Sequence, residues 1–188
     1  MADDDTLEGK LLIAMPGMGD ENFEKSVIFM CAHSEDGALG LIINKPIENL
    51  DFASLIEKLD IAADRPKRDI RIHVGGPVES GRGFVLHTGD YNSDGATLHI
   101  NNGFGMTATP DVLEDIASGE GPEDAILALG YSGWGPGQLE GEILQNGWLT
   151  CDAKHEIIFG SDDNAKWSAA LATLGVDPLL LSADAGRA

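Results

Sequence analysis

Short apolar segments fill the first half of the chain, and most of them have the pattern of β-strands. Every residue from 27 to 32 is apolar, which is typical of a central strand covered on both faces. In the segment 70–74, apolar residues alternate with polar ones, which predicts a half-buried strand with His73 facing solvent. The predicted strands cover residues 10–14, 26–33, 38–44, 70–74, 83–88, 96–100, 104–108, 124–130, 147–151 and 155–159.

Predicted helices are fewer and scattered. The apolar residues of the segment 51–59 recur at i, i+3, i+4 and i+7, which predicts one amphipathic helix. A Thr-Pro-Asp sequence at residues 109–111 predicts a second, because threonine can cap a helix and proline fits its first turn. Two more are predicted at residues 138–144 and at 167–174, the last with Leu174 on its buried face. Because strands and helices do not alternate regularly, the pattern favours an α+β fold with a mixed or antiparallel sheet.

Length and composition are those of one folded domain. The chain has 188 residues, of which 43% are hydrophobic, and no linker or repeat divides it. We therefore expect a single domain over residues 1–188, with residues 1–8 as a disordered N-terminal tail and 179–188 as a C-terminal tail. The acidic N-terminus lacks the features of a signal peptide, and the longest apolar run is far shorter than the roughly 20 residues of a membrane span.

Acidic residues far outnumber basic ones: 32 aspartates and glutamates against 12 lysines and arginines give a net charge of −20. Lysine and arginine provide affinity for nucleic acid and for anionic membranes, so this balance argues against both kinds of partner. Residues 83–153 contain eleven acidic residues and no lysine or arginine. Cys31 and Cys151 lie far apart in apolar runs, as expected of buried reduced thiols, which predicts a cytoplasmic protein.

The segment 130–142 combines glycines with two aromatic residues and is the strongest candidate for a functional surface. Its first residues nearly match the G-x-S-x-G nucleophile motif around Ser132, but Trp134 replaces the last glycine and the predicted helix begins several residues later. Tyr131 and Trp134 could instead anchor a partner. The alternative is that Trp134 fills the core and the glycines merely turn the chain. The candidate binding residues here are Tyr131, Ser132, Trp134 and Gln138.

Two other places carry candidate binding residues. Asn44 and Lys45 end a predicted strand, where polar side chains can face a ligand. Arg82 lies in a second glycine-rich element, residues 75–83, and could contact an anion. Alternatively, Asn44 only forms hydrogen bonds with the backbone of a turn and Lys45 only faces water. The segment 75–83 would then be a purely structural turn. This element lacks the Gly-Lys-Ser/Thr ending of a phosphate-binding loop.

The histidines and cysteines do not have the spacing of a metal site. No His-x-x-x-His or His-Glu-x-x-His sequence occurs. Cys31 and His33 share one face of a predicted strand, but two ligands are too few to hold zinc. We therefore predict no metal, no cofactor and no catalytic residue.

Several motifs occur in order along nearly the whole chain. They are Leu12–Pro16, Cys31–His33, Gly37–Pro46, Gly75–Val78, Arg82–His87, Ala128–Tyr131, Gly137–Glu140, Trp148–Leu149 and Gly175–Asp177. Together they resemble the YqgE/AlgH family of bacterial proteins. The resemblance implies an α+β structure whose bifurcated sheet closes into a pseudo-barrel with helices packed outside. It implies no established activity and no catalytic residues, although one member is proposed to be a transcriptional regulator.

These features together predict a non-enzymatic regulatory or protein-interaction module in the cytoplasm, acting with an unknown protein partner. Two alternatives stay open: a transcriptional regulator that binds DNA directly, and an enzyme acting on a small anionic substrate. The sequence predicts no particular oligomeric state.

Overall fold

The structure is a computed structural model that describes residues 6–16, 23–61 and 66–178. Within these ranges nine strands form one sheet in the order β6-β7-β5-β8-β3-β2-β1-β9, with β4 beside β8. The strands are β1 (Lys10–Ala14), β2 (Val27–Ser34), β3 (Gly37–Ile42), β4 (Arg71–Val74), β5 (Val78–Thr88), β6 (Thr97–Ile100), β7 (Phe104–Thr107), β8 (Ala125–Trp134) and β9 (Trp148–Asp152). The helices are α1 (Phe52–Lys58), α2 (Pro110–Ala117), α3 (Gln138–Leu144), α4 (His155–Ile158) and α5 (Asp163–Thr173).

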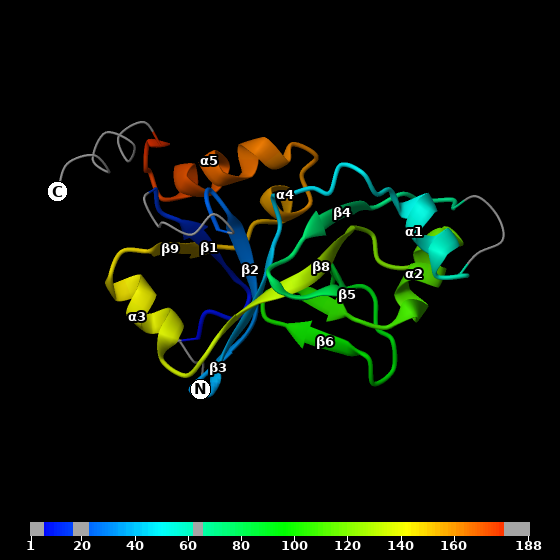
Figure 1. Cartoon of the computed structure of the whole chain (residues 1–188), viewed down its shortest axis with the longest axis horizontal. Helices are drawn as coiled ribbons and strands as arrows, with labels where there is room; N and C mark the ends of the chain where they lie inside the picture. Colours follow the sequence, from blue (N-terminus) through cyan, green and yellow to red (C-terminus); the bar gives the residue numbers. More distant parts are fainter. Residues whose placement is uncertain (1–5, 17–22, 62–65, 179–188) are drawn as a thin grey trace.

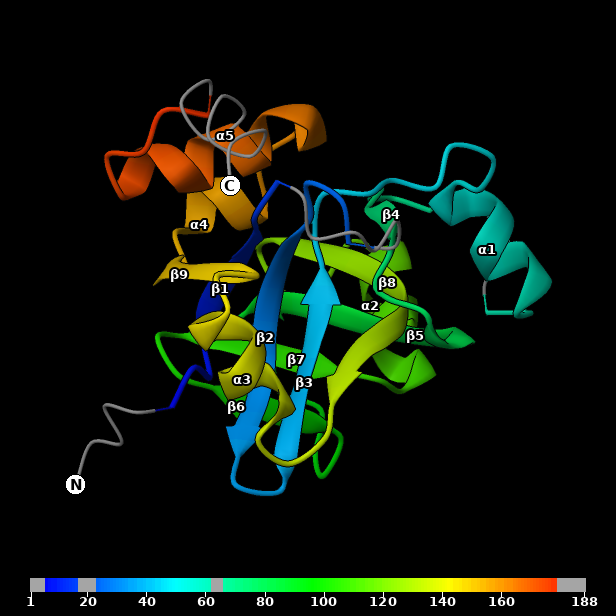
Figure 2. The same ribbon diagram turned by 60° about the vertical axis from the view of Figure 1, so that its left-hand side comes forward.

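The sheet is largely antiparallel and strongly curled. Among the pairs between named strands only β4 with β8 is parallel. Helices α3 and α5 lie beside β1 and β9, whereas α1 and α2 lie at the other end, near β4 and β8 (Figure 1). Strands β2 and β3 cross in front of β5, β6 and β7 in Figure 2, so the sheet forms a half-barrel flanked by helices. The predicted α+β fold with a mixed, largely antiparallel sheet is confirmed.

Strand β8 joins the two halves of the sheet. Its first half pairs with β4 and β5, and its second half pairs with β3. Between them, Gly130 has a φ of 78°, a left-handed conformation that favours glycine. Gly76 passes so close to the two residues after Gly130 that a Cβ at position 76 would overlap the backbone of Tyr131 and Ser132. This close crossing agrees with the structural interpretation of residues 75–83.

The crossing at Gly76 gives a testable expectation. Gly76→Ala should lower the free energy of unfolding by about 1–3 kcal/mol, because the added methyl group meets strand backbone that cannot shift without disturbing β8. Gly81→Ala is the matched control, since a Cβ there meets no atom within 4 Å. Urea unfolding of both variants measures the difference. Equal stability of the two would contradict the crowded crossing.

Buried side chains form three clusters, and β2 contributes to two of them. Val27, Phe29 and Cys31 belong to the cluster beneath α4 and α5, while Ile28 and Met30 belong to the cluster that also contains Trp134 and Trp148. Strand β2 is therefore covered on both faces, as its apolar run predicts. The third cluster packs α1 and α2 against β4, β5 and β8.

Three local predictions are wrong. Residues 155–159 are not a strand but begin with helix α4, since a short apolar run does not by itself distinguish strand from helix. His73 is fully buried, because α5 supplies a partner for it. Leu174 follows the end of α5 and is 42% exposed. Thr109 is the N-cap residue of α2 and Pro110 lies in its first turn, as predicted, although the Thr109 side chain makes no capping hydrogen bond.

The predicted tails are only partly within the described residues. The backbone N–H of Leu7 donates to Nδ1 of His33 over 2.9 Å, and Leu7 packs against the cluster around Trp148. Thr6 and Leu7 therefore contact the folded domain, while the disordered tail stays a prediction. Residues 1–5 and 179–188 lie outside the described residues.

Candidate functional site

A pocket of about 540 Å³ opens where the end of β8 meets α3. We call it the tryptophan pocket. Its lining residues come from three separate segments and are Met15, Pro16, Phe23, Gly133, Trp134, Gln138, Glu142, Gln145, Asn146 and Gly147. Gly137, with a φ of 75°, turns the chain sharply from β8 into α3 and so brings strand and helix together.

The carboxylate of Glu142 organises the back of this pocket. Its Oε1 accepts hydrogen bonds from the indole N–H of Trp134 at 3.1 Å and of Trp148 at 2.9 Å. Its Oε2 accepts from the amide of Gln138, which lies one turn earlier on α3, at 3.0 Å. One acidic side chain therefore fixes two tryptophan rings from two different strands.

The two tryptophan rings that donate to this carboxylate pack with the ring of Phe23. The rings of Phe23 and Trp134 are inclined by 25° with centroids 6.4 Å apart. Trp148 stands edge-on to both, with centroid distances of 5.6 Å to Phe23 and 6.0 Å to Trp134. Such perpendicular arrangements are favoured by the charge distribution of aromatic rings. The pocket thus combines aromatic surface with one acidic group.

The structure brings together only some of the predicted residues of the segment 130–142. Trp134 and Gln138 both line the tryptophan pocket. Trp134 is only 7% exposed, which agrees with the alternative that its ring fills the core. Ser132 is buried with its hydroxyl donating to the Gly75 carbonyl at 3.2 Å, and Tyr131 packs edge-on against Phe84. A role of these residues in binding stays a prediction.

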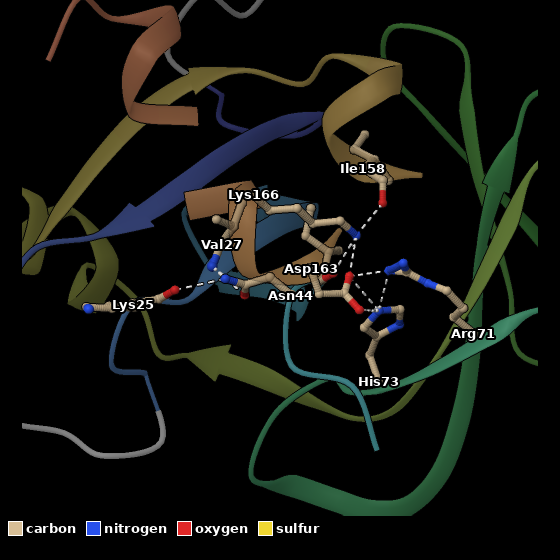
Figure 3. Close-up of polar contacts among 9 residues, drawn as sticks. Lys25, Val27, Asn44, Arg71, His73, Ile158, Asp163 and Lys166 are labelled. Atoms are coloured by element: carbon tan, nitrogen blue, oxygen red, sulfur yellow. Dashed lines mark hydrogen bonds and ion pairs between the residues drawn. The ribbon is translucent and has the colours of Figure 1, made fainter. Parts of the chain in front are cut away.

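Asn44 and Lys45 line a different pocket, of about 420 Å³, which we call the lysine pocket. Its lining residues are Glu24, Lys25, Asn44, Lys45, Asp163, Asn164, Trp167, Ser168 and Pro178. Asn44 accepts from the Val27 N–H at 2.9 Å and donates to the Lys25 carbonyl at 2.8 Å (Figure 3). Both ends of the Asn44 amide are thus used in linking the ends of β2 and β3.

Next to the lysine pocket lies a buried group of charged side chains that the sequence interpretation missed. We call Arg71, His73, Asp163 and Lys166 the ion cluster (Figure 3). Lys166 is 2% exposed, and its ammonium donates to the carbonyls of Ile43 and Ile158 at 2.8 Å each and to Asp163 at 3.0 Å. All three of its protons are therefore used.

Asp163 is the centre of the ion cluster. Its carboxylate contacts the guanidinium of Arg71 and Nε2 of His73, the latter at 3.1 Å, besides Lys166. Burial by itself raises the pKa of Asp163, but hydrogen bonds from His73 and Lys166 outweigh it and lower the pKa to about 2. Burial also lowers the pKa of Lys166 to about 8. These contacts fix α5 to β4 and leave Lys166 no free proton to direct at a ligand.

A sequence signal for the ion cluster did exist. Lys166 lies one turn before Ala170 on the buried face of α5, where a lysine needs partners. Asp163 precedes it by three residues, a spacing that places both on the same helix face. Arg71 and His73 lie 92 and 90 residues from Asp163, so no local pattern identifies them.

Arg82 does not join either pocket. Its side chain is 57% exposed, lies 3.6 Å from the carboxylate of Glu79 and covers the ring of Phe84. Burial raises the pKa of both Cys31 and Cys151, which are free thiols and so stay protonated. In the described part of the chain, no group of three or more His, Cys, Asp or Glu side chains is placed to hold a metal ion.

Comparison with known proteins gives consistent matches over the chain. The AlgH-like family profile matches residues 11–179. A UPF0301 protein of Cereibacter sphaeroides is 57% identical over 182 residues, covering 97% of this chain and 99% of the relative. A UPF0301 protein of Ruegeria pomeroyi is 59% identical over 183 residues, with the same coverage of both chains.

Solved structures agree with this assignment. The solution structure of the AlgH protein from Pseudomonas aeruginosa superposes with a TM-score of 0.80 at 43% identity, covering 100% of this chain and 99% of that one. A crystal structure from Corynebacterium diphtheriae has a TM-score of 0.72 at 23% identity, covers 93% of this chain and 90% of that one, and supports the fold alone. These names designate a family and no activity. The resemblance seen in the sequence is confirmed, and the chain belongs to the AlgH-like family.

Proposed function

We propose that this chain is a regulatory interaction module that binds a protein partner at the tryptophan pocket. The observation that carries the proposal is the pocket itself, which presents aromatic rings and one carboxylate beside an exposed apolar residue. Leu144, between the lining residues Glu142 and Gln145, is 84% exposed. Aromatic anchors with nearby apolar surface are typical of contact sites between proteins.

The bonding of the reactive side chains supports binding rather than catalysis. Lys166 and Asp163 use their polar atoms within the ion cluster, and the hydroxyl of Ser132 bonds to backbone. An enzyme for a small anion would use the lysine pocket, where Lys25 and Lys45 stand beside Glu24 and Asp163. That mixed lining offers no net positive charge, so we rank this alternative second.

The net charge supports a role through a protein partner, and the state of the thiols supports a cytoplasmic location. A net charge of −20 disfavours direct DNA binding, so a regulatory role would act through another protein. Both cysteines are free, as expected in the reducing cytoplasm where we place the module. No helix in the described ranges is long and apolar enough to cross a bilayer.

Site-specific photo-crosslinking in native cells tests the proposal. A benzoylphenylalanine placed at Gln145, an exposed residue of the pocket rim, should crosslink one protein partner. The same group at the exposed Glu120, beyond the end of α2, is the matched control and should not crosslink it. Adding Phe23→Ala to the Gln145 probe should remove the adduct. Equal adducts at both positions, or an adduct that survives Phe23→Ala, would contradict a partner site at this pocket.

A further inference from the structure

We infer that the tryptophan pocket recognises a positively charged side chain on a basic segment of the partner, with the guanidinium of arginine as the best fit. The inference rests on the proposed function and adds the chemistry of the bound group. It follows from the charge of the pocket lining, from its aromatic rings and from the field of the whole chain.

The described lining of the pocket carries one negative charge, and none of these residues is basic. Among the ten lining residues that belong to the described part of the chain, Glu142 alone has an ionisable side chain. Its three contacts come from neutral donors, two indole N–H groups and the amide of Gln138. Asp163 in the ion cluster, by contrast, is matched by the cationic side chains of Lys166 and Arg71. A cation entering the tryptophan pocket would give Glu142 its opposite charge.

The aromatic rings favour the same kind of ligand. A cation within about 6 Å of a ring centroid is attracted to the negative face of that ring, most strongly for tryptophan. Phe23 and Trp134 both line the pocket. Guanidinium is flat, stacks on rings and donates several hydrogen bonds in one plane, so it suits a pocket with both rings and a carboxylate. Gln145 and Asn146 add amide oxygens at the rim.

The charge of the chain around the pocket also favours a cationic ligand. The pocket elements β8 and α3 lie within residues 83–153, which contain no lysine or arginine. Such a region attracts basic partners and raises their rate of association. In the lysine pocket, by contrast, Lys25 and Lys45 stand beside Glu24 and Asp163, so acidic and basic groups balance there. The two pockets therefore differ in the ligands they attract.

Indole N–H signals in NMR spectra test this directly. Trp134 and Trp148 donate to Glu142, whereas Trp167 donates to the Ala14 carbonyl and serves as an internal control. Titration with the peptide acetyl-Gly-Arg-Gly-amide should shift the first two signals and leave the third unchanged. The same peptide with citrulline, a neutral isostere of arginine, should bind at least tenfold more weakly, a difference of about 1.4 kcal/mol. A lysine peptide should bind between the two.

Two variants complete the experiment. Glu142→Gln removes the charge at nearly constant shape and should weaken the arginine peptide at least tenfold, as measured by the same shifts. Glu140→Gln removes the same charge from an exposed position of α3 outside the pocket lining and should have no such effect. Equal binding of arginine and citrulline peptides, or no shift at about 10 mM peptide, would overturn the inference.

If the crosslinked partner is nevertheless lost with Phe23→Ala, the proposed function stands and only the cation is wrong. If the arginine peptide binds but crosslinking at Gln145 fails, the pocket binds a cation and the proposed protein partner is wrong.

Discussion

Asp163→Ala is expected to lower the free energy of unfolding by about 3–5 kcal/mol, because it leaves buried positive charge without its partner. Lys166 is 2% exposed and would keep only two carbonyl contacts. His73, fully buried, would lose the carboxylate that contacts its Nε2, and Arg71 would lose the same carboxylate. Chemical denaturation at neutral pH, followed by circular dichroism, measures the loss.

Two further variants separate charge from local helix effects. Asp162→Ala changes the exposed neighbour, which makes no capping hydrogen bond through its side chain, and should leave stability within about 0.5 kcal/mol. Asp163→Asn keeps an oxygen acceptor and should lie between the wild type and the alanine variant. An Asp163→Ala variant as stable as the wild type would mean that the ion cluster does not stabilise the fold.

The lowered pKa of Asp163 predicts how the stability of the protein changes in acid. The pKa of Asp163 is lowered from 3.8 to about 2, so the folded state holds the ionised form more tightly than the unfolded chain does. Its contribution to stability is complete above pH 3.8 and is lost as the pH falls through about 2. The wild type should therefore lose about 2 kcal/mol more than Asp163→Asn over this range. If the free energies of unfolding of the two proteins fell by the same amount over this pH range, the lowered pKa would be contradicted.

Local patterns were sufficient for most of the elements. The helix predicted at residues 138–144 matches α3, and the strand at 10–14 matches β1. Asn102 and Gly103 both have positive φ, as a tight turn between β6 and β7 requires. These features depend on a few adjacent residues. The strand predicted at 155–159 failed because its apolar residues pack beneath α5 as part of α4.

The candidate site was predictable only in part, because it is assembled from distant segments. Trp134 and Gln138 belong to one glycine-rich segment and were found from its composition. Phe23 and Trp148 reach the same place from other parts of the chain, and only the tertiary structure brings them there. The ion cluster similarly joins β4 to α5 across 90 residues or more. The sequence therefore indicates which residues need partners but not which partners they find.

Trp134 offers the sharpest test of how the pocket is built. Trp134→Ala is expected to lower the free energy of unfolding by about 3–5 kcal/mol, the usual loss for a buried tryptophan. The side chain is 7% exposed, contacts the rings of Phe23 and Trp148, and donates its N–H to Glu142. Truncation removes this packing and one of the donors to a half-buried carboxylate. Urea unfolding measures the effect.

Two control variants make the result interpretable. Leu144→Ala shortens a side chain that is 84% exposed on the same stretch of chain and should change stability by less than about 0.5 kcal/mol. Trp134→Phe keeps most of the packing but loses the N–H, so it should cost about 1–3 kcal/mol. A loss below about 1 kcal/mol for Trp134→Ala would place the ring outside the core. The indole would then be free to act as an exposed anchor, and the arrangement of Glu142 between two tryptophans could no longer explain the shape of the pocket.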